Sequence, residues 1–230
     1  MKRIVLFLIP TLFLLYSCKS REDKALELID QQMFQTLYDY DSYQPVETKV
    51  DSAFTSPYYS DSILALVMIY DEYQKRADDY KDKADDAQST MEIWEDSYSS
   101  YARTRYREAR TKWIDNTISS ITEHKKALTA ILMASEAIRD FKPEYYGWAV
   151  YHKYRCKSKG GNALLCEAIY IVDNDIKSII KTIDIDDDDY KKAKKHIDEI
   201  IEDMSDEYIK GFEDLIEQLE TLIDLYESLK

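Results

Sequence analysis

The residues best suited to chemistry are two cysteines and a histidine in one short segment. Cys156 and Cys166 flank Gly160 and Gly161, which predict a turn between two strands, so that both thiols reach one face of a hairpin. Outside the cytoplasm such a pair can form a disulfide, and two buried free thiols are the alternative. A metal site of Cys156, Cys166 and His152 matches no zinc spacing. His152 is more typical of a half-buried structural histidine than of a catalytic base.

A second candidate is an acidic cluster formed by Asp184 and residues 186–189. An EF-hand loop that began at Asp184 would need glycine at its sixth position and an acid at its twelfth, where Asp189 and Lys195 stand. We therefore expect the cluster to cap the next helix, with calcium binding as the minor alternative. The chain has no Gly-x-Ser-x-Gly, phosphate-loop or His-Glu-x-x-His motif. These observations predict no catalytic residues, no metal, no cofactor and no enzymatic activity.

The first residues have the pattern of a bacterial export signal. Its parts are a basic pair, an apolar run too short for an ordinary spanning helix, and a cysteine: Lys2, Arg3, Ile4–Leu15 and Cys18. Leu15, Ser17 and Cys18 resemble the lipobox of bacterial lipoprotein precursors, and the bulky Tyr16 departs mildly from it. The resemblance implies that residues 1–17 are a signal peptide and that Cys18 is lipidated and anchors the chain in a membrane. A plain secretory signal is the alternative.

Three further stretches are similar to segments of uncharacterised lipoproteins, the first two to those of Bacteroidetes. They are the acidic Glu22-Asp23 after the cysteine, the stretch 43–57, and the pattern Trp148-x3-His152-x2-Arg155. This resemblance implies kinship and a location in the cell envelope, namely the outer membrane on its periplasmic or external side. It implies no activity.

Charge limits the kinds of partner. Without residues 1–17 the chain has 29 basic and 45 acidic residues, a formal balance of -16. Nucleic-acid binding requires a basic surface, so we expect no nucleic-acid partner. An anionic membrane surface is also an unsuitable docking face apart from the lipid anchor.

The long central segment, 58–142, contains neither glycine nor proline and predicts long helices. Apolar and tyrosine residues recur at three- and four-residue spacing: Ile63, Leu66, Tyr70, Tyr73, Ala77, Tyr80, Ala84, Ala87, Met91, Trp94, Tyr98 and Tyr101. A single rod of about 120 Å and an antiparallel hairpin that reverses near Ser97–Ser100 both fit. The hairpin is favoured because it would place the acidic segment 78–95 opposite the basic segment 103–112.

Two features of this segment have alternative interpretations. The basic run 103–112, with Tyr101 and Tyr106 beside or within it, is a binding patch for an acidic ligand or, more simply, neutralises the opposite arm. The tyrosine stripe is core packing with hydroxyls that reach water, or a platform for carbohydrate.

After Pro143 the hydrophobic period changes from about 3.6 to 2. Trp148, Val150 and His152 alternate with neighbours that point to the other face, and two further strands follow at 163–172 and 176–185. The sequence thus predicts a three-stranded antiparallel meander. Three amphipathic helices are expected outside it, at 24–40, 190–204 and 206–229, and an extended loop at 41–59.

The predicted fold is mainly α (α+β), with coiled-coil-like arms. Its segments are a signal peptide (1–17), an anchor with a short helix and an extended loop (18–59), a long helical hairpin (60–142), a β-meander (143–186) and C-terminal helices (187–230). The expected function is that of a lipid-anchored structural or protein-interaction module with a protein partner in the envelope. A surface protein that binds glycan or peptide is the alternative. The oligomeric state stays open, because a heptad seam can close within one chain or between chains.

Overall fold

The computed structural model describes residues 19–96 and 98–230, and the chain forms two compact units. One unit combines the chain up to Thr55 with Glu144–Asp187, and we call it the sheet unit. The other combines Ser56–Pro143 with Asp188–Lys230, and we call it the helical unit. The prediction of a mainly helical protein with an antiparallel sheet is confirmed.

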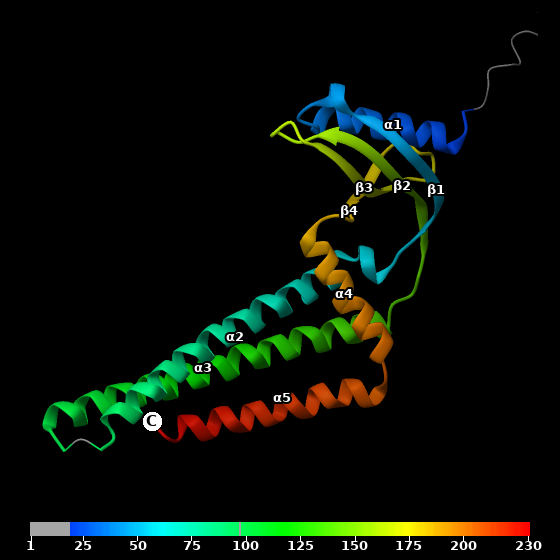
Figure 1. Ribbon diagram of the computed structural model, residues 1–230. Helices are drawn as coiled ribbons and strands as arrows, with labels where there is room; N and C mark the ends of the chain where they lie inside the picture. Colours follow the sequence, from blue (N-terminus) through cyan, green and yellow to red (C-terminus); the bar gives the residue numbers. More distant parts are fainter. Residues whose placement is uncertain (1–18, 97) are drawn as a thin grey trace, which may run out of the picture. The chain divides into compact units, whose positions relative to one another are not determined.

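The sheet unit contains a four-stranded antiparallel sheet, not the three-stranded meander that the sequence predicts (Figure 1). Its strands, in their spatial order, are β1 (Gln44–Phe54), β2 (Tyr145–Lys157), β3 (Ala163–Val172) and β4 (Ile179–Asp184). The added strand is β1, which pairs with β2 from Gln44 opposite Arg155 to Phe54 opposite Tyr145. It lies in the segment predicted to be a loop, because Pro45, its second residue, and Pro57, shortly after it, suggest irregular backbone.

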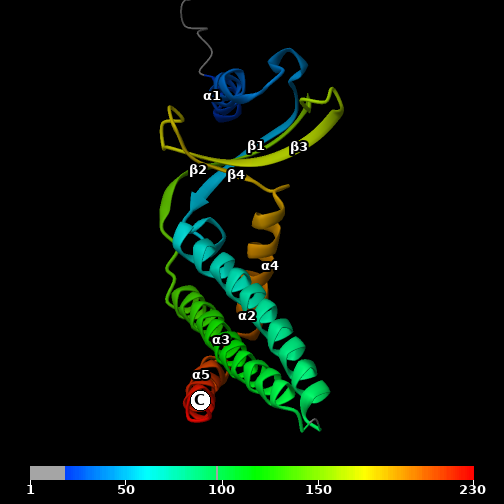
Figure 2. The same cartoon turned by 90° about the vertical axis from the view of Figure 1, so that its left-hand side faces the viewer.

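Helix α1 (Arg21–Thr36) covers one face of this sheet (Figure 2). The helix begins with a capping box, in which Ser20 accepts a hydrogen bond from the Asp23 amide and Asp23 accepts one from the Ser20 amide. Its buried side chains meet inward residues of β2 and β3 and Ile176 of the turn after β3 in one core: Ala25, Ile29, Met33, Val150, Ala168, Tyr170, Val172 and Ile176. A short 3-10 helix, η2 (Tyr40–Ser42), connects α1 to β1.

The helical unit is built on an antiparallel hairpin of two long helices, as the sequence predicts. They are α2 (Asp61–Trp94), which follows the 3-10 helix η3 (Pro57–Tyr59), and α3 (Ser100–Arg139). Ser99 caps α3, because its side chain accepts a hydrogen bond from the Ala102 amide. Where the two helices meet near the turn, the buried residues are small: Ala77, Ala84, Ala87, Ala102 and Ala109. The two helices can therefore approach closely.

Two C-terminal helices complete this unit, α4 (Asp188–Asp203) and α5 (Asp206–Glu227), close to their predicted bounds. Helix α4 packs on α2, and α5 packs along α3. At the end of the hairpin away from the turn the core is larger and aliphatic, with Ile63, Val67, Ile131, Ile138, Ile197 and Ile200. The end near the turn contains no such cluster among the described residues.

Candidate functional site

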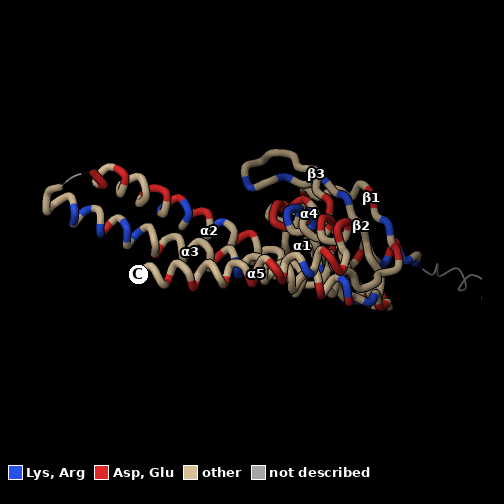
Figure 3. The backbone as a smooth tube through the Cα atoms, turned by 90° about the horizontal axis from the view of Figure 1, so that it is seen from below, with Lys and Arg blue, Asp and Glu red and all other residues tan. Residues whose placement is uncertain are grey.

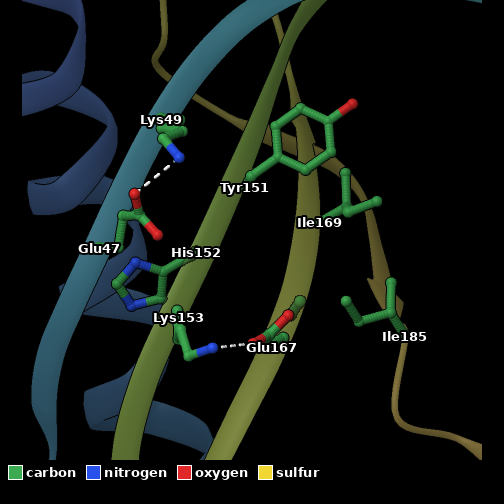
Figure 4. Close-up of a pocket in the computed structure, with 9 residues that line it drawn as sticks. Glu47, Lys49, Tyr151, His152, Lys153, Glu167, Ile169 and Ile185 are labelled. Atoms are coloured by element: carbon green, nitrogen blue, oxygen red, sulfur yellow. Dashed lines mark hydrogen bonds and ion pairs between the residues drawn. The ribbon is translucent and has the colours of Figure 1, made fainter.

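The chain has two hollow surfaces of interest, and the first lies on the sheet face away from α1. It is a cavity of about 350 Å³. Its lining comes from β1, β2 and β3 and from the residue after β4: Glu47, Lys49, Tyr151, His152, Lys153, Glu167, Ala168, Ile169 and Ile185 (Figure 4). We call it the sheet cavity. Tyr151 is 43% exposed and stands beside Ile169, so the cavity offers an aromatic ring and an aliphatic surface to a ligand.

The charged residues of the sheet cavity form two ion pairs. The Lys49 ammonium lies 2.7 Å from a Glu47 carboxylate oxygen, and Lys153 pairs with Glu167 across β2 and β3. The hydrogen bond from Lys49 lowers the pKa of Glu47, and the hydrogen bond to Glu167 raises the pKa of Lys153. Glu47 is therefore ionised and Lys153 protonated near neutral pH. These groups suit hydrogen bonding to a polar ligand better than proton transfer.

The His152 side chain belongs to the other side of the sheet, where it is buried under an aromatic cluster. Its Nε2 lies 2.9 Å from the Tyr43 hydroxyl and its Nδ1 lies 2.9 Å from the Thr48 hydroxyl. Its ring stacks on Tyr154, with ring centroids 5.4 Å apart. Burial lowers its pKa from 6.5 to about 4, and a hydrogen bond with the Glu47 backbone opposes this only in part. The imidazole is thus neutral at pH 7, and both nitrogens are occupied by structural partners.

The tyrosines around His152 are held in the same apolar environment. Burial raises the pKa of Tyr170 to about 12 and raises the pKa of Tyr43 and of Tyr154 as well. All three phenols are therefore protonated, and the Tyr43 hydroxyl can donate to the Nε2 atom of His152. The sequence points to His152 but does not identify its partner Tyr43, which is 109 residues away in the chain.

The structure brings the two predicted cysteines together at one end of the β2–β3 hairpin. Their sulfur atoms lie 4.0 Å apart, and both thiols are free. Cys166 is opposite Tyr154 and Cys156 is opposite Leu164, so the two cysteines are diagonal neighbours on one face. Burial and the neighbouring Cys156 raise the pKa of Cys166 to about 11. The disulfide remains a prediction. His152 does not join the two cysteines, because no group of three or more potential metal ligands occurs in the part of the chain described.

The second hollow surface lies at the turn of the helical hairpin. It is a cavity of about 460 Å³ lined by Trp94 and Glu95 at the end of α2 and by Arg103, Tyr106 and Arg107 of α3. Large side chains near it are exposed, with Ile93 at 72%, Tyr98 at 91% and Tyr101 at 57%. We call these eight residues together the arm tip.

The arginines of the arm tip have no carboxylate partner among the described residues. Arg103 Nη2 donates to the Tyr98 carbonyl oxygen at 3.4 Å, and Arg107 Nε donates to the Arg103 carbonyl oxygen at 3.3 Å. Over residues 19–96 and 98–230, no ion pair joins the acidic segment of α2 to the basic segment of α3. The closest equivalent lies further from the turn, where Arg76 and Glu123 approach to 3.8 Å. The expectation that the two arms neutralise each other through such pairs is therefore wrong in this structure.

Other predicted features have structural roles. Tyr70, Tyr73 and Tyr80 of the tyrosine stripe are half-buried along α2. In the acidic cluster, Asp188 and Asp189 occupy the first turn of α4, where carboxylates interact favourably with the helix dipole.

Two predictions concern the membrane. Cys18, the predicted lipidation site, lies outside the described residues. Among the residues that the structure does describe, no helix combines the length and apolar character that a bilayer crossing requires.

Glu47 and Lys49 of the sheet cavity are not predicted from the sequence, because their segment reads as a loop. The alternation of Val46, Thr48 and Val50 with charged residues is the signal that could have identified the strand. Comparison of the chain with protein-family models, with curated proteins and with solved structures found no match.

Proposed function

We propose that this chain is a lipid-anchored lipoprotein of the bacterial cell envelope that acts as a protein-interaction module and has no enzymatic activity of its own. The observation that carries the proposal is the arm tip, where Arg103 and Arg107, which have no acidic partner in the described chain, line a cavity with Trp94 and Tyr106. Tyr98 and Tyr101 are exposed near it. The lipobox-like residues that end at Cys18 support the anchor. The outer membrane, on either its periplasmic or its external side, is the proposed location.

The composition of the arm tip supports a protein partner. Tyrosine, tryptophan and arginine are the residues enriched at the energetic centres of protein interfaces. The arm tip contains all three, and Tyr98 and Tyr101 expose large rings to solvent. Each arginine also has several N–H donors available for a carboxylate on a partner. The heptad spacing of α2 supports a coiled-coil-like arm that presents this surface.

The experiment is in-cell crosslinking of the tagged full-length chain in its source bacterium, followed by mass spectrometry. Three variants accompany the wild type: Cys18→Ala, which removes the proposed anchor, Tyr98→Ala with Tyr101→Ala, which removes two rings of the arm tip, and Tyr151→Ala as a control on the sheet cavity. We expect a specific crosslinked protein that is lost in the first two variants and kept in the third. Recovery of nothing above background, with efficient crosslinking, would overturn the proposal.

A second function has one specific observation in its favour, the sheet cavity. Its exposed Tyr151 beside two ion pairs resembles the combination of stacking surface and polar groups that suits a glycan or an extended peptide. The test is a binding screen of the full chain against oligosaccharide and peptide arrays. Binding that Tyr151→Ala abolishes and Tyr38→Ala preserves would favour this function, since Tyr38 is also exposed but lies outside the cavity.

A further inference from the structure

The starting observation is a row of acidic side chains on α2 near the turn. Asp82, Asp85 and Glu92 recur at spacings of three and seven, which places them on one stripe of the helix, and all three are exposed. None of them forms an ion pair within the described chain, although Gln88 donates a hydrogen bond to Glu92 at 3.4 Å. We call these residues the acidic row.

A complementary row of basic side chains lies on α3. Arg103, Arg107 and Arg110 recur at spacings of four and three, so they too share one stripe. Their hydrogen bonds go to backbone carbonyl oxygens, which leaves most of their N–H donors available to a partner. We call these residues the basic row. Figure 3 shows the distal part of the hairpin with red segments along α2 and blue segments along α3.

Both rows lie on the same broad face of the hairpin. Asp85 directly follows the buried Ala84, and Arg103 and Arg110 directly follow the buried Ala102 and Ala109. In a pair of antiparallel α-helices, a residue that directly follows a buried contact residue points to the same side of the pair, whichever helix it belongs to. The cavity of the arm tip agrees, because Glu95, directly after α2, lines it together with Arg103 and Arg107 of α3.

The rows also lie at similar heights along the hairpin. The Ser120 hydroxyl donates to the Ala77 carbonyl oxygen at 2.8 Å, which fixes the register of the two helices. Counting from this bond toward the turn, Asp85 stands near residue 112 and Glu92 near residue 105. The acidic and basic rows are therefore side by side near the turn.

We infer that two copies of this chain pair through this face, with the acidic row of each copy on the basic row of the other. A two-fold axis parallel to the arms places α2 of one copy over α3 of its partner, with both turns at the same end. Because a two-fold interface uses the same patch twice, one patch with both signs of charge side by side is self-complementary. The inference rests on the proposed function and names its partner as a second copy of the chain.

The end of α5 leaves open the part of this face that lies closer to the turn than Arg110, at the level of Glu92, Arg103 and Arg107. Arg110 Nη2 donates to the Leu229 carbonyl oxygen at 2.9 Å, and Lys230 Nζ lies 2.9 Å from Asp115. Helix α5 thus stops at the level of Arg110, and the part of α3 closer to the turn has no described helix of this chain over it other than α2.

The pairing is of modest strength and depends on salt. Exposed ion pairs are individually weak and are screened by electrolyte. Two copies on one membrane gain from a raised effective concentration, so the contact is stronger between anchored chains than in dilute solution.

The test is sedimentation velocity of the full-length chain in detergent, over a range of concentrations, at about 50 mM and about 500 mM NaCl. We expect reversible dimers that weaken at the higher salt concentration. Reversal of one row, Arg103→Glu with Arg107→Glu or Asp85→Lys with Glu92→Lys, replaces attraction by repulsion and raises the dissociation constant about tenfold or more. The matched control is Asp79→Lys with Asp86→Lys, an equal charge change on another stripe of α2, which leaves dimerisation in place.

The decisive measurement combines the two reversals. An equimolar mixture of the two reversed variants, or one chain that carries all four substitutions, restores opposite charges at both contacts of the dimer. Recovery of the dimer supports the inference. A monomer at every concentration in the wild type, or failure of the four-substitution chain to recover while its circular dichroism matches the wild type, overturns it. If the wild type is monomeric while in-cell crosslinking from the arm tip captures another protein, the proposed function stands and this inference fails.

Discussion

Protonation of His152 should destabilise the sheet unit at mildly acidic pH. Burial lowers the pKa of this histidine in the folded chain from 6.5 to about 4, so the unfolded chain binds the proton more tightly. Stability from this residue is therefore complete above pH about 6.5 and is lost as the pH falls toward 4. The difference in pKa between the folded and the unfolded chain corresponds to about 3 kcal/mol in the free energy of unfolding. At pH about 5, about 2 kcal/mol of this stability has been lost.

The assay is urea unfolding between pH about 5 and about 7, a window above the range in which most carboxylates titrate. Trp148 lies in the sheet unit, while Trp94 and Trp113 lie in the helical unit. A background with Trp94→Phe and Trp113→Phe makes Trp148 fluorescence a reporter of the sheet unit alone. In this background, His152→Gln keeps polar atoms at the site but removes the titration.

When the pH drops from about 7 to about 5, we expect the free energy of unfolding to fall by about 2 kcal/mol more in the chain that keeps His152 than in the His152→Gln chain. The physical reason is that a charged imidazole would have to remain in buried, largely apolar surroundings, where the charged form is poorly solvated. Equal pH dependence of the two chains would refute this reasoning and would mean that the ring is hydrated in the folded state.

Three further predictions test the packing. Gly147→Ala should lower the free energy of unfolding by about 2 kcal/mol or more, because the φ of Gly147 is 151° and a Cβ would lie 2.1 Å from a carbonyl oxygen of β3. Gly211→Ala, on α5 with open space around it, should raise the free energy of unfolding by up to about 1 kcal/mol. Urea unfolding measures both changes. The chain isolated from the envelope should carry a Cys156–Cys166 disulfide worth about 2–3 kcal/mol, and alkylation of two native thiols in intact-mass measurements would contradict this. Ala84→Leu should lower stability by about 1–3 kcal/mol by forcing α2 away from α3, and an unchanged thermal transition in circular dichroism would show that the seam is looser than the structure indicates.

The helices could be predicted from the sequence because their signals are local. The segment 58–142 lacks glycine and proline, and its small and apolar residues keep a helical period through both arms. The charge pattern also favours the hairpin, although the described residues form none of the ion pairs near the turn that this argument assumes. The acidic and basic rows are visible in the sequence. Whether they share a face of the hairpin depends on which alanines are buried between the helices, and this is known only from the structure.

The sheet cavity and the surroundings of His152 could not be predicted because they depend on pairing between distant segments. The whole helical hairpin separates β1 from β2 in the sequence. Thr55 and Glu144, 89 residues apart, form two hydrogen bonds of 2.7 and 2.8 Å next to the paired strands. No local period reports such a pairing, since its energetic gain appears only after the loop between the strands has closed. The same pairing supplies Glu47 and Lys49 to the cavity and Thr48 to His152. One unrecognised strand therefore accounts for most of the candidate site that sequence reasoning missed, and the polar and charged residues of that strand are the place where new variants are most informative.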